Sequence, residues 1–160
     1  MPKRSVPTLP DLVDRGLSPL LDEVAEAARR VVERIGPERD WVLCTNGGPR
    51  QEVRQLHFHL IADDRFVSDP GDTVETPLPA SIGIEAFHHP RPDWEFHLVL
   101  RARPASDLAA LALTALDLIR RFALGPRGYT LVIDPLTGAP HCLHLIAGSR
   151  TRPHSRSEQG

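Results

Sequence analysis

Two short stretches, LHFHLIADD at residues 56–64 and CLHLIAGSR at residues 142–150, decide the fold expected for this chain. They share the letters HLIA, and His144 follows His59 by 85 residues, an offset that also places Cys142 opposite His57. A Gly-Pro pair, a strand led by an aromatic residue and a turn precede each stretch. This order predicts an internal repeat. The alternative is that two unrelated helix-hairpin units share a common pattern.

Amphipathic helices are expected before both stretches. Apolar residues recur at helical spacing over residues 17–36 and again over about 107–124. Ser18 and Ser106 are the expected N-caps, and a Gly-Pro pair marks the end of each helix.

Alternating apolar residues predict six strands, at about 41–45, 52–62, 82–88, 94–101, 129–134 and 141–147. Over 52–62 the alternation places Gln55, His57 and His59 on one face, with Val53 and Ile61. The order of elements predicts the α+β class: an antiparallel sheet with two helices on one face, built from two pseudo-repeated helix-hairpin units. We expect a first unit at 1–65, a linker at 66–80, a second unit at 81–148 and a disordered tail at 149–160.

Composition narrows the class of protein. The net charge of −2 is spread over the chain, which gives no basic surface for a nucleic-acid backbone. The two cysteines suggest no disulfide framework and fit a reducing compartment. No apolar run is long enough to cross a membrane, and the first residues lack the apolar core of a secretory signal. We therefore expect a cytoplasmic protein without nucleic-acid or membrane partners.

Chemistry is concentrated in residues 51–61, QEVRQLHFHLI. Two imidazoles on one face of a strand, His57 and His59, offer hydrogen-bond donors and a nucleophile to a phosphate, and Gln55 extends the row. The alternative is a pair of histidines without a chemical role. Metal binding would need a third ligand, and the spacing of the other histidines and cysteines matches no zinc motif, so no metal site is predicted.

This segment resembles the signature of the histidine-triad (HIT) family, in which His-x-His-x-His precedes two apolar residues and follows Gln-x-Val. The matching positions are Gln51, Val53, His57, His59, Leu60 and Ile61. Gln55 stands where the first histidine of the triad is usual, Cys44 stands where the family has Asn, and Glu52 where it often has Ser or Thr.

Residues 81–148 resemble a second, degenerate copy, which keeps Phe87, Pro92 and His97 of the family's N-terminal hairpin. Of the triad it keeps His144, with Cys142 at the middle position. Residues 1–9 resemble the end of that same hairpin, so the first copy lacks the rest of it. The whole resembles a shortened tandem of the galactose-1-phosphate uridylyltransferase type.

The resemblance implies a mechanism. His57 would attack the α-phosphate of a nucleotide and form a nucleotidyl-imidazole intermediate, while His59 and Gln55 donate hydrogen bonds to the phosphate. The residues expected to cradle the phosphate are Gln51, Asn46, Gly47 and Gly48.

The expected activity is that of a nucleotide hydrolase or nucleotidyltransferase, acting on a nucleotide or nucleotide-sugar without a cofactor. The alternative is a catalytically inactive nucleotide-binding or scaffold protein with a HIT-like fold. Because HIT proteins commonly dimerise, a homodimer is one expected assembly. Metal binding by His57 and His59 with a neighbouring residue is the weakest alternative.

Overall fold

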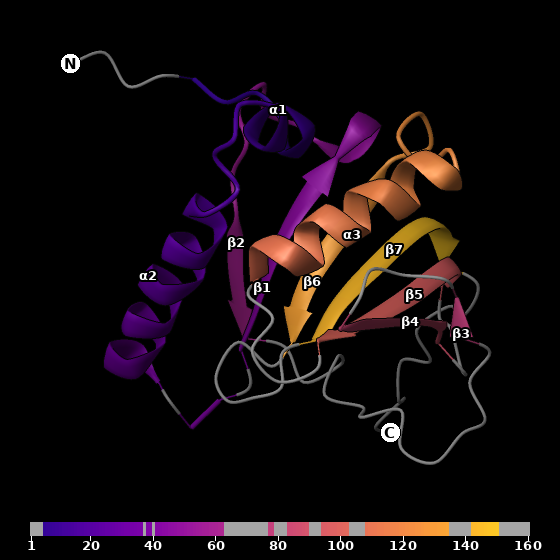
Figure 1. Cartoon of the computed structure of the whole chain (residues 1–160). Coiled ribbons are helices and arrows are strands. Elements are labelled where there is room, and N and C mark those ends of the chain that lie inside the picture. Colours follow the sequence, from indigo (N-terminus) through magenta and orange to yellow (C-terminus); the bar gives the residue numbers. More distant parts are fainter. Residues whose placement is uncertain are drawn as a thin grey trace, which may run out of the picture.

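A computed structural model describes residues 5–36, 38–39, 41–62, 77–78, 83–89, 94–102, 108–134 and 142–150 (Figure 1). The helices are α1 (Leu9–Asp14), α2 (Leu20–Ile35) and α3 (Leu108–Arg121), with a short 3-10 turn, η1 (Gly48–Arg50). The strands are β1 (Trp41–Gly47), β2 (His59–Ala62), β3 (Pro77–Leu78), β4 (Ile84–His88), β5 (Trp94–Ala102), β6 (Tyr129–Asp134) and β7 (Cys142–Arg150).

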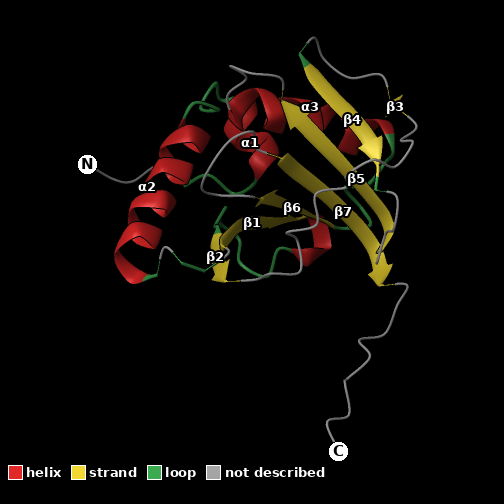
Figure 2. Ribbon diagram, turned by 90° about the horizontal axis from the view of Figure 1, so that it is seen from below, coloured by secondary structure: helices red, strands yellow, loops and turns green. Residues whose placement is uncertain are grey.

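The strands form a single sheet in the order β2-β1-β6-β7-β5-β4-β3, and neighbouring strands are antiparallel throughout. The α+β class predicted from the sequence is therefore confirmed. Figure 2 shows α2 at the β2 end of the sheet and β4 at the opposite end. The sheet is continuous across both expected units, because β1 pairs directly with β6.

Two hairpins, β1–β2 and β6–β7, have matching registers. Cys44 lies opposite His59 in the first, and Val132 lies opposite His144 in the second. Further along the same hairpins the pairs are Trp41–Ala62 and Tyr129–Ala147.

The main core lies between the helices and one face of the sheet. It contains Leu21 of α2, Leu111 of α3 and Leu145 of β7, all at most 3% exposed, together with Leu9 and Leu12 of α1. The prediction of two helices on this face was wrong, because α1 also packs there. Its signal is present in the sequence: Thr8 caps the helix by accepting from the Asp11 amide, and a proline stands in the first turn.

The start of α3 is capped from another helix. The Asp22 carboxylate of α2 accepts a hydrogen bond from the Leu108 amide at 2.9 Å. Ser18 does not cap α2. The N-cap residue of this helix is Pro19, and no side chain makes a capping hydrogen bond there. Ser106 lies outside the described residues.

The expected strand at 52–62 is wrong in its first part, because β2 begins only at His59 and residues 53–55 form a bend. Tertiary contacts hold this segment: the Leu56 amide donates to the carbonyl of Val6, and the Thr45 hydroxyl donates to the carbonyl of His57. At the other boundaries, β3 lies within the expected linker, and β7 continues through residues 149–150, which we expected in the disordered tail. Residues 151–160 lie outside the described part.

Candidate functional site

The two histidines of the expected site lie together at the start of β2. His59 is exposed and sits opposite Cys44 of β1, while His57 is partly buried two residues earlier. Their ring centroids are 4.8 Å apart, and the rings meet edge to face at 77°. The prediction that these imidazoles are neighbours is met, although only His59 belongs to a strand.

The backbone around His57 orients its ring. Its Nδ1 atom lies 3.0 Å from the carbonyl oxygen of Gln55. Because a carbonyl oxygen only accepts, Nδ1 carries the hydrogen in this contact and Nε2 of the neutral ring keeps a lone pair. The hydroxyl of Thr45, 2.7 Å from the carbonyl of His57, fixes the same residue from β1.

Gln55 contributes its carbonyl to this arrangement, not a side chain in line with the imidazoles. It lies in the bend at 53–55 and is exposed, so the strand alternation that aligned it with His57 does not apply. The prediction of a single row formed by Gln55, His57 and His59 on one strand face is therefore wrong.

The expected phosphate-cradling side chains have partners within the protein. The Gln51 amide donates to the carbonyls of Pro7 and Val53, the latter at 2.9 Å, so it joins the N-terminal segment to this loop. The Asn46 side-chain oxygen accepts from the Thr130 hydroxyl of β6 at 2.7 Å.

The glycines of the turn are packed tightly against a second turn. A Cβ on Gly47 would lie 2.1 Å from the ring of Tyr129, and one on Gly48 would lie 2.1 Å from the carbonyl of Gly125. Gly48 also has φ +61°, a conformation that favours glycine. These glycines therefore serve close packing between residues 47–48 and 125–129.

Arg50, which we did not predict as a functional residue, fastens this turn to the sheet. Its guanidinium donates to the Thr130 hydroxyl at 3.1 Å and to the carbonyl of Gly148, and it lies 5.3 Å from the centroid of the Trp94 ring. An arginine in a turn gives no sequence signal for this role, because its partners are 44 to 98 residues later in the chain.

In the β6–β7 hairpin, the histidine that aligns with His59 is His144, and it is buried. His144 is 4% exposed and His97 of β5 is 8% exposed, and His97 Nε2 lies 2.9 Å from His144 Nδ1. The His89 ring stacks on His97 at 4.4 Å. Burial, with the neighbouring His144 and His89, lowers the pKa of His97 to about 3. Burial and then His89 lower the pKa of His144 to about 4, so both rings are neutral near pH 7.

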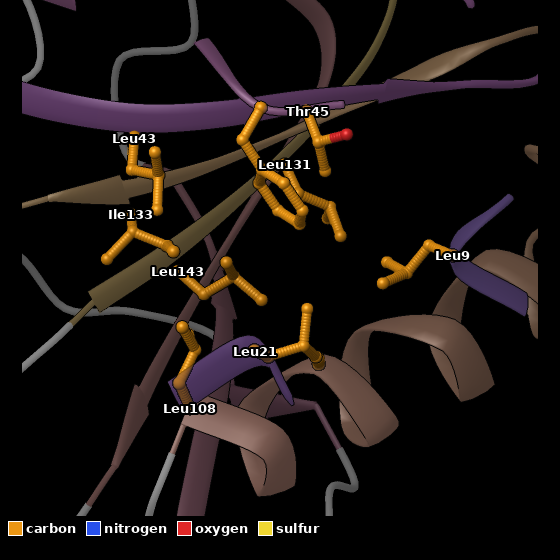
Figure 3. A pocket seen from close by; sticks show the side chains of 10 residues that line it. Leu9, Leu21, Leu43, Thr45, Leu108, Leu131, Ile133 and Leu143 are labelled. Atoms are coloured by element: carbon orange, nitrogen blue, oxygen red, sulfur yellow. The ribbon is translucent and has the colours of Figure 1, made fainter. Parts of the chain in front are cut away.

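An apolar pocket lies between the helices and strands β1, β6 and β7 (Figure 3), on the face of the sheet opposite to that of His59 by strand alternation. Leu43 and Thr45 of β1 line it, and Cys44, which stands between them and opposite His59, points to the opposite face. The space is about 310 Å³, including the part open to solvent. Its other lining residues are Leu9, Leu21, Phe58, Leu108, Ala112, Leu131, Ile133 and Leu143. The Thr45 hydroxyl donates its hydrogen to the carbonyl of His57, so it can act toward the pocket only as an acceptor.

Within the described ranges, no group of three or more His, Cys, Asp or Glu side chains is arranged to hold a metal ion. None of the helices in the described part of the chain has the length and apolar character needed to span a membrane. No protein-family model, no curated protein and no solved structure matches the chain.

Proposed function

We propose that His57 and His59 form a phosphate site at which His57 attacks the α-phosphate of a nucleotide or nucleotide-sugar. The observation that carries this proposal is the contact between His57 Nδ1 and the carbonyl of Gln55. It leaves Nε2 as the ring nitrogen available for attack, on a ring that is only partly buried. The ring of His59, 4.8 Å away, is close enough to donate to an oxygen of the same phosphate.

The proposed reaction has two steps. In the first, Nε2 of His57 forms a bond to phosphorus as the bond from phosphorus to the leaving group breaks, and the leaving group departs with that electron pair and takes a proton from solvent. In the second, water attacks phosphorus and the P–N bond breaks, which releases a nucleoside monophosphate and restores the imidazole. A different acceptor in place of water makes the same chemistry a nucleotidyl transfer.

We also propose that the fold is a HIT-like tandem of two helix-hairpin units. The support is the register of the two hairpins. Cys44 pairs with His59 in the first hairpin, and Val132 pairs with His144 in the second. Val132 follows Cys44 by 88 residues and His144 follows His59 by 85, so the two pairs occupy equivalent positions. Cys44 also lies opposite Val132 in the β1–β6 pair. Equivalent residues that face each other across an antiparallel pair are what a local two-fold axis between the units requires.

A second candidate, an inactive nucleotide-binding or scaffold protein, is favoured by a different observation. The side-chain amide of Gln51 donates to backbone carbonyls, and the Asn46 oxygen accepts from Thr130. Gly47 and Gly48 are packed against another turn. A phosphate bound here would rely on the imidazoles, so this candidate retains binding without an adequate set of donors for catalysis.

The test is turnover of an adenosine monophosphate phosphoramidate, together with mass spectrometry of acid-sensitive adducts after rapid alkaline quenching. We expect an adenylyl adduct on His57 and loss of activity in His57→Ala. His59→Ala should lower kcat by about 10²-fold, the typical effect of one phosphate donor. The matched control is His88→Ala, which removes an exposed imidazole from β4 at the far end of the sheet and should leave the rate unchanged.

The outcomes separate the candidates. Unchanged turnover in His57→Ala would refute the nucleophile assignment. Absence of both turnover and adduct in the wild-type protein would refute catalysis. If AMP still raises the melting temperature, and if this shift requires His57 and His59, the binding candidate stands.

A further inference from the structure

Helix α2 has more apolar surface than the core uses. Its residues Leu21, Ala25, Ala28 and Val32 are buried against the sheet and the other helices. A second row, one position away on the helix, includes Leu20, Val31 and Ile35, which are 37%, 45% and 61% exposed. Their spacing, with partly buried Val24 and exposed Ala27 between them, keeps this row on one side of the helix.

The position of α2 leaves this row accessible. The helix stands at the β2 end of the sheet in both views of the molecule (Figures 1 and 2), and β2 is the outermost strand of the described sheet. We name the row Leu20, Val24, Ala27, Val31 and Ile35 the α2 seam. Half of the large hydrophobic side chains that are exposed in the described structure belong to it.

We propose that the α2 seam is a dimer interface, on which the α2 helix of a second copy of this chain packs in antiparallel orientation. In that arrangement the row is self-complementary. Leu20 of one copy meets Ile35 of the other, Val24 meets Val31, and the small Ala27 lies at the centre, where the helices approach most closely. The first four seam residues are separated by four, three and four positions, which is the pattern of knobs-into-holes packing, and Ile35 follows Val31 by four more.

The charges beside the seam favour the same occupant and the same orientation. The first half of α2 carries Asp22, Glu23 and Glu26, and the second half carries Arg29, Arg30 and Arg34 together with Glu33. In an antiparallel pair, Glu23 of one copy lies near Arg34 of the other, because both exposed side chains flank the seam on the same side of the helix. A parallel pair would place acidic halves together and basic halves together, which costs electrostatic energy.

The oligomeric state tests this proposal directly. We expect sedimentation equilibrium of the full chain to give a dimer that dissociates on dilution. Val31→Glu should shift this equilibrium at least tenfold toward monomer. Leu113→Glu is the matched control, because Leu113 is a similarly exposed apolar residue, at 46%, on α3. Circular dichroism of both variants checks that the fold is kept.

Disulfide formation tests the antiparallel orientation of the two α2 helices. Oxidised wild-type protein is the control for any cross-linking through Cys44 or Cys142. Ala27→Cys should form a symmetric intermolecular disulfide, whereas Leu20→Cys, which faces Ile35 of the other copy, should not. Three results would overturn the proposal: a wild-type monomer at 100 µM or above, a dimer equally weakened by both glutamate variants, or cross-linking of Leu20→Cys in preference to Ala27→Cys. A dimer insensitive to Val31→Glu places the interface elsewhere and overturns it as well.

Discussion

Lowering the pH should destabilise this protein through the buried pair His97 and His144. Their pKa values in the folded state are about 3 and about 4, against 6.5 for an unperturbed histidine. As the pH falls below 6.5 the unfolded chain therefore takes up protons that the folded chain does not. Stability contributed by the neutral pair is fully present above pH 6.5 and is lost as the pH falls toward the folded values.

The magnitude follows from the unfolded pKa alone, as long as the pH stays above the folded values. At pH 5, protonation in the unfolded state favours unfolding by about 2 kcal/mol for each imidazole relative to pH 8, or about 4 kcal/mol for the pair. This is a large part of the 5–15 kcal/mol typical of a domain.

The assay is urea denaturation at pH 8 and pH 5, for the wild-type protein and for the double variant His97→Leu/His144→Leu. Exposed histidines and carboxylates are common to both proteins, so the difference between their pH dependences isolates the buried pair. We expect the wild type to lose about 4 kcal/mol more than the double variant. Parallel pH dependences would refute the reasoning. Histidine ring NMR of the wild type provides a second readout that needs no variant, because two imidazoles should remain neutral down to pH 5.

Three further predictions concern stability and are measured by urea midpoints. Gly48→Ala should lower the free energy of unfolding by more than about 2 kcal/mol, because the new Cβ would overlap a backbone oxygen. Gly16→Ala, where φ is +68° and no atom lies within 4 Å, should lower it by only about 1 kcal/mol. Equal losses would count against the packing argument. Asp22→Ala should cost about 1 kcal/mol by uncapping α3 at Leu108, and Asp22→Asn should recover most of it. Arg50→Lys should lower the free energy of unfolding by about 2 kcal/mol, because lysine cannot donate to Thr130 and Gly148 at once as the guanidinium does. An unchanged urea midpoint would mean that these two hydrogen bonds contribute little to stability.

The regular elements with strong periodicity could be read from the sequence. Helices α2 and α3 follow from apolar residues at helical spacing, and β6 has the predicted bounds because its alternation is uninterrupted. These features are local, so one sequence carries enough information to predict them.

The parts that could not be predicted depend on distant contacts. Alternation suggested a strand through Gln55 and His57, but residues 53–55 form a bend, after which Val6 and Thr45 bind the backbone of Leu56 and His57. Ser18 was expected to cap α2 but makes no capping hydrogen bond, whereas Asp22 of α2 accepts a hydrogen bond from the Leu108 amide of α3, a contact between distant residues. The neighbouring imidazoles of the candidate site were predicted, whereas the carbonyl that orients His57 depends on that bend.

The pairing of β1 with β6 has a consequence for synthesis on the ribosome. Strand β1 ends at Gly47, and its inner neighbour begins only at Tyr129. Until that later segment has left the exit tunnel, one edge of β1 presents unsatisfied amides and carbonyls, and the apolar side chain of Leu43 lacks its cross-strand partner Ile133. A nascent chain that already contains β1 therefore exposes an unpaired strand edge while residues 48–128 are being synthesised, which favours aggregation at this stage.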